Sequence, residues 1–233
     1  MKIEIWSDVM CPFCYIGKHN FEHALEKLPF KDEIELEWKS FQLDPGLDAS
    51  KPQNTVEYFK EKKGFPAEQA SQMIGQVAQM GKNVGIDFNF EKALIINTFT
   101  AHKLLHLAKK YGKANEMEEA LFIAHFTDGK NVGDIKELVA LAENLGIDKD
   151  EARQALTSNE FDSEINQDIQ EAKNNSISSV PFFVLNGKYA VSGAQPAEVF
   201  ADALQQAYKE TVSPFKDLSK EGGTSCDTDG CTI

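Results

Sequence analysis

The sequence predicts an α/β fold in which two strand-bearing segments share one sheet and a long helical block is inserted between them. Three observations support this prediction. The first 50 residues have the pattern of strand, helix and strand. Strand periodicity returns only near residue 180. Almost everything between has helical periodicity, a share well above the usual third. The two ends can form one sheet only if the middle of the chain is an insertion.

The N-terminal segment is predicted to form a βαβ unit. Apolar and polar residues alternate over residues 2–6, which indicates a half-buried strand. Helical spacing follows over residues 15–28, and alternation returns over residues 33–41. We therefore expect two parallel strands joined by a right-handed crossover. A turn at residues 43–46 and a linker at residues 47–54 end the unit.

The middle of the chain is predicted to be a series of helices. They are expected over residues 55–63, after Pro66, over residues 97–111 and 116–126, after caps at Asp134 and Asp148, and over residues 161–172. Thr55 is the expected cap of the first helix. Met73 and Met80 share the apolar face of the second helix. A flexible apolar groove is one interpretation, but we expect these methionines to be ordinary core.

The C-terminal segment is predicted to form a ββα unit. A strand over residues 180–185 precedes Asn186-Gly187, a strong hairpin signal, and residues 188–192 form the returning strand. A last helix begins near residue 194 and ends before Pro214. Pro181 is unusual at the start of a strand because it has no N–H to donate, and a cis bond after Val180 would explain it.

These elements give an expected domain organisation. Residues 1–50 and 176–212 are predicted to form one domain from two segments. Residues 51–175 form the inserted helical domain, and residues 213–233 form a polar, glycine-bearing tail that is expected to be disordered.

The composition excludes several classes of function. The net charge of −13 and a single arginine, Arg153, argue against a nucleic-acid partner. No apolar run approaches the roughly 20 residues that cross a bilayer. The first residues run into a strand without a signal-peptide pattern, so we expect a cytoplasmic protein. Four cysteines in two close pairs are too few to staple a chain of 233 residues, which indicates reactive thiols.

The chemistry is expected at Cys11-Pro12-Phe13-Cys14, at the junction of the first strand and the first helix. A helix N-terminus favours a thiolate, so the cysteine placed there is expected to have a pKa below the free value of roughly 8.5 and to act as a nucleophile. The second cysteine can attack the mixed disulfide that results. The alternatives are half of a zinc site or two buried thiols. No matching second ligand pair at conventional spacing is present inside the expected folded region, so we predict redox chemistry and no metal at this site.

Three motifs together carry a family resemblance. They are Ser7-Asp8-Val9-x-Cys11-Pro12-x-Cys14-Tyr15-Ile16-Gly17, Asn97-Thr98-x-x-Ala101-His102 and Ser179-Val180-Pro181-x-Phe183. With the βαβ and ββα pattern they resemble the thioredoxin fold with a DsbA-type helical insertion, and are most similar to the FrnE-like DsbA-family thiol oxidoreductases. Relatives of that family are 2-hydroxychromene-2-carboxylate isomerase and the kappa-class glutathione transferases. The resemblance spans about residues 1–212.

The resemblance implies roles for particular residues. Cys11 would be the exposed attacking thiol, Cys14 the resolving thiol and Pro181 a cis-proline facing them. Val180 would give backbone hydrogen bonds to an extended substrate segment. Pro12 and Phe13 would tune the redox potential beside that substrate. The isomerase and transferase relatives carry serine at the position of Cys11, so this chain departs from them in favour of disulfide chemistry.

Two further residues near the motif have open roles. His102 could lie at the cleft and polarise a thiol or hold a glutathione carboxylate; a structural histidine is the alternative that we favour. Asp8 could accept a proton from Cys14, but we expect it to accept hydrogen bonds within the local turn.

The tail carries a second close pair, Cys226 and Cys231, separated by four residues. Some FrnE-like proteins carry such a pair, and we predict that it relays electrons between Cys11–Cys14 and outside thiols. Capture of a soft metal and incidental solvated thiols are the alternatives.

The sequence thus predicts a protein disulfide oxidoreductase or isomerase with a redox-active disulfide and no other cofactor. Its expected partners are protein thiols and disulfides, with glutathione as a possible co-substrate, and neither nucleic acid nor membrane. The oligomeric state, monomer or homodimer, stays open. A glutathione-dependent transferase or isomerase in the same cleft is the alternative enzyme, and a redox-regulated holdase is the alternative outside enzymes.

Overall fold

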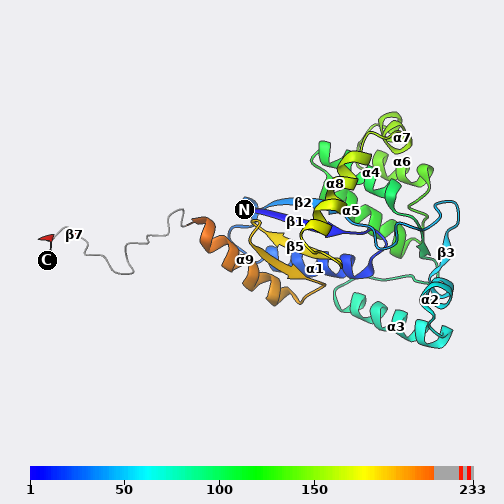
Figure 1. Ribbon diagram of the computed structural model, residues 1–233, viewed down its shortest axis with the longest axis horizontal. Helices are drawn as coiled ribbons and strands as arrows, with labels where there is room; N and C mark the ends of the chain where they lie inside the picture. The colour runs from blue at the N-terminus through cyan, green and yellow to red at the C-terminus, as the bar shows by residue number, and fades with distance from the viewer. Residues whose placement is uncertain (213–225, 228–229, 232–233) are drawn as a thin grey trace.

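The computed structural model describes residues 1–212, 226–227 and 230–231, and its centre is a four-stranded sheet (Figure 1). The strands are β1 (Lys2–Ser7), β2 (Glu35–Ser40), β5 (Phe182–Leu185) and β6 (Tyr189–Ser192), in the order β2-β1-β5-β6. As predicted, β1 and β2 are parallel, with Ile3 opposite Leu36. Strand β5 is antiparallel to β1 on its other side, so the two ends of the chain share one sheet.

Helices α1 (Pro12–Leu25) and α9 (Ala197–Val212) pack together on the sheet. Their contact surface is apolar and includes Phe21, Phe183 and Phe200, with ring centroids between 4.6 and 5.7 Å apart. The connection between β5 and β6 is the predicted Asn186-Gly187 turn, in which both residues have positive φ, 54° and 65°. This half of the molecule therefore has the βαβ and ββα elements that the sequence predicts.

The helical elements lie between β2 and β5 in the chain. They are α2 (Thr55–Lys63), α3 (Ala67–Asn83), α4 (Phe99–Lys110), α5 (Ala114–Phe122), a π-helical turn (Ile123–Thr127), α6 (Ile135–Asn144), α7 (Lys149–Thr157) and α8 (Asp162–Asn174). A short 3-10 turn (Lys31–Glu33) and a two-stranded pair, β3 (Gln53–Asn54) with β4 (Leu94–Ile95), complete the described elements before residue 213.

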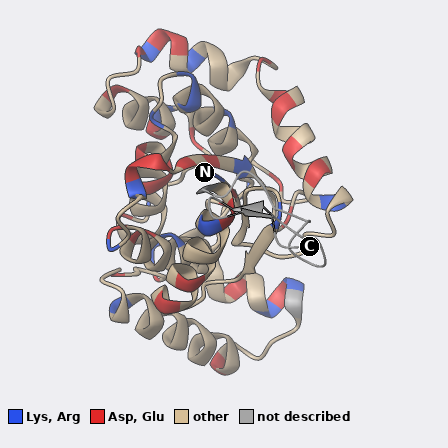
Figure 2. Ribbon diagram, turned by 90° about the vertical axis from the view of Figure 1, so that its left-hand side faces the viewer, with Lys and Arg blue, Asp and Glu red and all other residues tan. Residues whose placement is uncertain are grey.

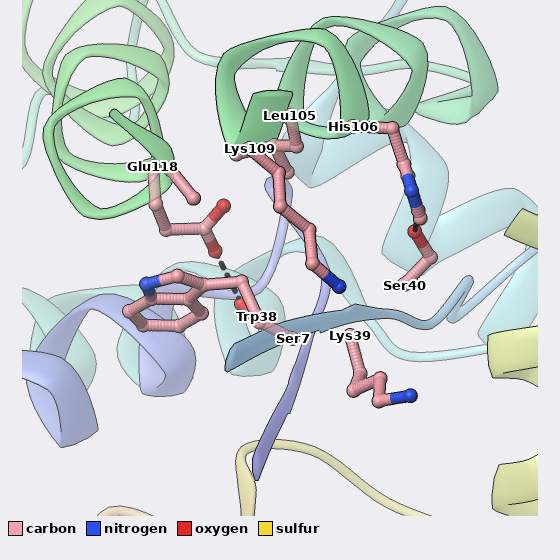
Figure 3. A pocket seen from close by; sticks show the side chains of 9 residues that line it. Ser7, Trp38, Lys39, Ser40, Leu105, His106, Lys109 and Glu118 are labelled. Carbon is pink, nitrogen blue, oxygen red and sulfur yellow. Dashed lines mark hydrogen bonds between the residues drawn. The ribbon is translucent and has the colours of Figure 1, made fainter. Parts of the chain in front are cut away.

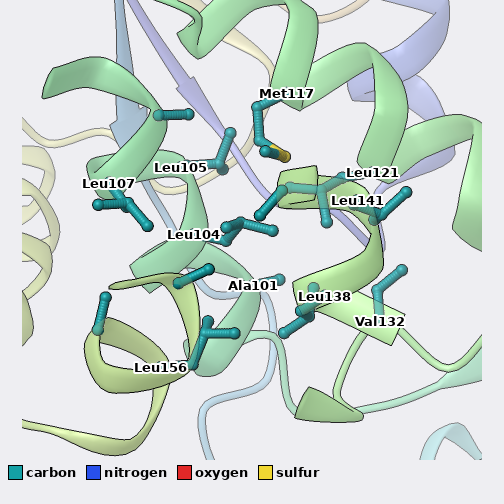
Figure 4. Close-up of a cluster of buried hydrophobic side chains, with 14 of the residues drawn as sticks. Ala101, Leu104, Leu105, Leu107, Met117, Leu121, Val132, Leu138, Leu141 and Leu156 are labelled. Atoms are coloured by element: carbon teal, nitrogen blue, oxygen red, sulfur yellow. The ribbon is translucent and has the colours of Figure 1, made fainter. Parts of the chain in front are cut away.

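The helices from α4 to α8 share a core of their own (Figure 4). Leu104, Leu107, Met117, Leu121 and Leu138 have no exposed surface. By contrast, α3 has only Ala70 and Gly81 buried along its 17 residues. Helix α3 is thus packed less deeply than the helices of that core, and it contacts α1 (Figure 1).

Several predicted boundaries are corrected. Helix α1 begins at Pro12, three residues before the predicted start, because Pro fits the first helical position. Asn54, not Thr55, caps α2, since its side chain accepts from the N–H groups of Val56 and Glu57. The predicted caps Asp134 and Asp148 are confirmed by hydrogen bonds to backbone N–H groups.

In the part of the chain that the structure describes, no helix is long and apolar enough to cross a membrane. The prediction that Pro214 ends the last helix falls on residues outside the described ranges, as does most of the tail that is predicted to be disordered. The described residues of that tail, 226–227 and 230–231, form a pair of short strands, which the sequence analysis did not predict.

Candidate active site

Both cysteines of the first pair lie at the start of α1. Cys11 is the N-cap residue with an extended backbone, Pro12 follows at the first helical position, and the Cys14 N–H donates to the Cys11 carbonyl at 3.0 Å. Neither thiol takes part in a disulfide. The N–H groups of a first helical turn have no partners within the helix, so the pair occupies the end of α1 that favours negative charge.

Cys11 is covered, which corrects the expectation of an exposed thiol. Only 3% of its surface is exposed, against 1% for Cys14. The Cys11 thiol donates to the Val180 carbonyl, with 3.6 Å between sulfur and oxygen. The covering groups come from the loop before β5 and from the walls of a cleft, and these approach only in the folded chain.

The loop before β5 packs against the start of α1, beside Cys11. The Val180–Pro181 bond is cis, as predicted. A Cβ atom at Gly17 would lie 2.8 Å from Pro181 Cγ, closer than real side chains approach. A side chain at Gly17 would therefore displace the loop that bonds Cys11, which explains the glycine at the end of the first motif.

A cleft of about 520 Å³ opens beside Cys11. Pro12, Phe13 and Val180 line it on the side of the cysteines, and α2 and α3 line the opposite side. Met73 and Met80 belong to this second wall and are 39% and 42% exposed. The prediction that they are ordinary core is therefore wrong. A helix face that borders a cleft has the same apolar periodicity as a face that packs in a core.

A buried carboxyl group lies behind Cys14. Glu118 of α5 is 1% exposed, and its Oε1 accepts a hydrogen bond of 2.6 Å from the Ser7 hydroxyl at the end of β1 (Figure 3). Its Oε2 has no partner among the described residues. Burial raises the pKa of Glu118 to about 7, against the opposing effects of Ser7 and the positive charges nearby. Glu118 and Ser7 also line a small cavity of about 10 Å³.

Burial raises the pKa of Cys14 as well, and the hydrogen bond with Cys11 adds to this effect. The Ser7 side chain and the Asp8 backbone act in the opposite direction. The Ser7 hydroxyl therefore lowers the pKa of Cys14 and also donates a hydrogen bond to the Glu118 carboxyl group. This arrangement can carry a proton from Cys14 to Glu118, a group that titrates near neutral pH.

Asp8 holds the turn that carries the cysteines, as preferred from the sequence. Its carbonyl accepts from the Cys11 N–H at 2.9 Å, and its Oδ2 accepts from the Leu43 N–H at 2.7 Å. His102 is placed behind this turn, with its Nε2 3.6 Å from Asp8 Oδ1. It is 1% exposed and does not line the cleft, so the geometry favours the structural role.

The second cysteine pair lies in the separate hairpin of β7 (Cys226–Asp227) and β8 (Gly230–Cys231), where the backbones of Cys226 and Cys231 are directly opposite. The described residues contain no group of three or more His, Cys, Asp or Glu side chains that could hold a metal ion.

Comparison with known proteins gives this site a family. The model of the DSBA-like thioredoxin domain family matches residues 2–205. The chain belongs to this family.

Among curated proteins, this DSBA-like domain is similar to the uncharacterised protein YwbO of Bacillus subtilis. The two are 29% identical over 213 residues, which are 90% of this chain and 98% of YwbO. A solved probable DsbA oxidoreductase from Streptomyces coelicolor is 37% identical and matches with a TM-score of 0.87 over 100% of this chain and 99% of that one. A 2-hydroxychromene-2-carboxylate isomerase structure is 14% identical, with a TM-score of 0.66 over 93% and 100%, and shares the fold.

Two residues of the DSBA-like site were not predicted from the sequence. Glu118 lies in the helical pattern between Met117 and Leu121, both without exposed surface, and a charged residue in such a pattern was the available signal. His125 lines the cleft from the π-helical turn, which no feature of the sequence predicted.

Proposed function

We propose that the chain is a thiol–disulfide oxidoreductase that acts on protein substrates through Cys11 and Cys14. One observation carries the proposal: two free thiols lie one turn apart at a helix N-terminus, and the first of them borders a cleft beside the Val180–Pro181 loop. The family is one of oxidoreductases and isomerases, so its chemistry agrees with this arrangement.

In the reductive direction, the Cys11 thiolate attacks one sulfur of a substrate disulfide. A Cys11–substrate disulfide forms, and the other substrate sulfur leaves as a thiolate that takes up a proton. Cys14 then loses its proton through Ser7 to the Glu118 carboxylate and attacks Cys11 Sγ. The Cys11–Cys14 disulfide forms, and the second substrate thiolate leaves. Two electrons pass from the chain to the substrate, and the reverse sequence oxidises a dithiol.

A thiol map by mass spectrometry, after equilibration in a series of glutathione buffers, tests the proposal. We expect Cys11 and Cys14 to change state together as a single two-electron couple, because neither can form its disulfide without the other. The midpoint of the transition then distinguishes an oxidant from a reductant. Finding the pair reduced in every buffer, or Cys11 only as a stable glutathione adduct, contradicts the proposal.

The alternative is a glutathione-dependent transferase or isomerase in the same cleft, and the fold shared with 2-hydroxychromene-2-carboxylate isomerase agrees with it. The chemistry of the cleft favours protein substrates. Glutathione carries carboxylates, and the described residues that line the cleft include no lysine or arginine to bind them. Turnover of a small electrophile or chromene that survives the loss of Cys14 would establish the alternative.

We further propose that Cys226 and Cys231 pass electrons between outside thiols and the Cys11–Cys14 pair. Support comes from the backbone of the hairpin, in which the two residues are opposite one another, the arrangement from which a cross-strand disulfide forms. Deleting residues 222–233 is expected to slow multiple-turnover exchange while leaving the single-turnover reaction of Cys11 unchanged. A Cys226→Ser, Cys231→Ser chain is the matched control for loss of the segment itself. Equal multiple-turnover rates in all three chains would exclude the relay.

Cytoplasmic location remains a prediction.

A further inference from the structure

Two sequence motifs from distant parts of the chain meet behind the active-site cysteines. Asp8 belongs to the first motif and precedes Cys11, whereas His102 belongs to the second motif and lies in the first turn of α4. The side chains of Asp8 and His102 are 0% and 1% exposed, and His102 Nε2 lies 3.6 Å from Asp8 Oδ1. The proposed exchange reaction uses neither side chain directly, so this buried contact needs an explanation of its own.

Asp8 holds both cysteines and the turn between them and β1. Its carbonyl accepts from the Cys11 N–H at 2.9 Å. Burial raises the pKa of Cys14, and a hydrogen bond with the Asp8 backbone opposes this effect. The Asp8 side chain accepts from the Met10 N–H at 3.5 Å and from the Leu43 N–H at 2.7 Å. A displacement of Asp8 would therefore move the whole turn that presents the first cysteine.

The second motif supports the same turn from the inserted helical domain. Asn97 donates to the carbonyl groups of Pro45 and Leu47, at 3.4 and 3.0 Å, and so holds the loop after β2. That loop also donates an N–H group to Asp8. The two ends of the motif therefore act together: Asn97 holds the loop directly, and His102 contacts the carboxylate to which the loop is bonded.

A buried carboxylate needs a compensating positive charge, and His102 is placed to supply it. Taking a carboxylate out of water costs free energy unless a cation compensates its charge. Among the described residues, Asp8 forms an ion pair only with His102, and neither ring nitrogen of His102 has a hydrogen-bond partner. The whole chain has 37 acidic side chains against 24 lysines and arginines, and both kinds are spread over its helices (Figure 2). This negative background makes a carboxylate without its own cation still less favourable.

The charges of Asp8 and His102 act on titratable groups of neighbouring elements. Burial raises the pKa of Glu118 on α5 to about 7; the charges of His102 and of Lys18 on α1 oppose this effect, and the charge of Asp8 adds to it. Burial lowers the pKa of His125 on the π-helical turn to about 4, and the charge of Asp8 opposes it. The two cysteines belong to the same turn as Asp8. An Asp8 charge without its cation would therefore disfavour their thiolates.

We infer that His102 is a positioning residue of the exchange reaction: it neutralises and holds Asp8, which keeps Cys11 in place beside the cleft and its thiolate favoured. The inference rests on the proposed function, because it gives the Asp8–His102 pair a role in the reaction of Cys11. It also explains why the two motifs occur in one chain. A histidine that stabilises the fold without affecting the thiols is the competing interpretation.

The first test is the rate at which Cys11 reacts with iodoacetamide at pH 6, followed by peptide mass spectrometry. This reaction requires the thiolate but no disulfide exchange. His102→Gln leaves Asp8 as an uncompensated anion, so the rate is expected to fall by about five- to tenfold. Adding Asp8→Asn removes the anion and keeps an acceptor oxygen for the Leu43 N–H, so the double variant is expected to recover most of the rate.

His106→Gln is the matched control. His106 lies one turn further along α4, is 9% exposed, and pairs with an aspartate of its own, Asp168, with 3.2 Å between Nε2 and Oδ2. Both histidine variants are expected to lose stability in urea, because each removes the histidine partner of a buried aspartate. Only His102→Gln is expected to slow the reaction of Cys11.

The second test is the midpoint of the Cys11–Cys14 couple in the series of glutathione buffers. A less favoured thiolate makes the reduced form less stable, so the equilibrium constant for reduction is expected to fall by about tenfold in His102→Gln. This change corresponds to a midpoint about 30 mV more negative. The double variant with Asp8→Asn is expected to return toward the wild-type midpoint, and His106→Gln is expected to keep it.

The outcomes separate this inference from the proposed function. A reaction of Cys11 that depends on His102, in a chain whose cysteines form no couple, refutes the proposed function and supports the inference. An unchanged rate and midpoint in His102→Gln, a loss that Asp8→Asn does not recover, or an equal loss in His106→Gln overturns the inference. In the Asp8→Asn background, His102→Gln should change the rate by less than about twofold, since burial disfavours a charge without a partner. A full loss there overturns the inference even if the single variant does not fold.

Discussion

A chain with Cys14→Ser is expected to hold its substrate as a stable mixed disulfide and to lose multiple-turnover exchange down to the rate of the buffer alone. The hydroxyl at position 14 cannot displace the substrate sulfur from Cys11, whereas Cys11 can still attack. Cys14 is 1% exposed and does not line the cleft, so a thiol from solvent cannot occupy its position beside Cys11. The adduct is measured by intact-mass spectrometry under non-reducing conditions, with a heptapeptide whose central cysteine is joined to 2-mercaptoethanol as substrate.

Cys11→Ser is the matched control, because it also replaces a cysteine sulfur by oxygen, one helical turn away from position 14. This chain is expected to lose turnover without accumulating an adduct, since Cys14, unlike Cys11, does not line the cleft. Equal adduct formation on both variants would contradict the assignment of the two roles. Undiminished turnover in Cys14→Ser would instead support the transferase or isomerase alternative.

Glu118→Gln is expected to raise stability at alkaline pH and to slow resolution of the mixed disulfide. The folded pKa of Glu118 is about 7, above the value of 4.5 that the group has when exposed. Its ionisation therefore has no cost below pH 4.5, lowers the stability of the folded chain progressively between pH 4.5 and 7, and has a constant cost above pH 7. A shift of this size corresponds to about 3 kcal/mol. The free energy of unfolding should be measured in urea for both chains at pH 5 and pH 8. The difference between variant and wild type should be up to about 3 kcal/mol more in favour of the variant at pH 8 than at pH 5.

Glu119→Gln is the neighbouring control with the opposite sign. The hydrogen bonds of Glu119 with His19, Lys18 and Tyr15 lower its pKa to about 2, against the effect of burial. Its ionised form therefore stabilises the fold above pH 4.5, and this contribution is lost as the pH falls toward 2. The glutamine variant should be less stable than wild type at pH 8, with unchanged resolution of the mixed disulfide. A Glu118→Gln chain that resolves the mixed disulfide at the wild-type rate would remove Glu118 from the mechanism, whatever its stability.

Local patterns in the sequence predicted most elements, because each depends on residues close together in the chain. The alternation over residues 33–41, the caps Asp134 and Asp148 and the Asn186-Gly187 turn all correspond to observed features. The π-helical turn after Phe122 was not predicted, since one additional residue in a turn leaves the apolar spacing nearly unchanged. The cap of α2 was misplaced by one residue because Asn54 and Thr55 are both suitable cap residues.

The candidate site was predicted where it is contiguous in the chain and missed where it is assembled from distant segments. Cys11, Cys14 and their helix form one short motif. Glu118 is buried only because Ser7 at the end of β1 meets α5, a contact across 111 positions. The cover over Cys11 and the cleft that Met73 borders likewise depend on α2 and α3 approaching α1. No spacing within one segment contains that information.

The order of the strands has a consequence for synthesis on the ribosome. Strand β1 is the second strand of the sheet, between β2 and β5, and Ile5 pairs with Phe183. At roughly 5 to 20 residues per second, about 10 to 35 s separate the emergence of these two partners. During that interval the nascent chain presents an unpaired apolar strand edge and two thiols that Val180 does not yet cover. Chaperones and oxidants therefore have access to the strand edge and to Cys11 and Cys14 before the active site is assembled. The yield of active protein depends on how well the edge is protected from aggregation and the thiols from oxidation during translation.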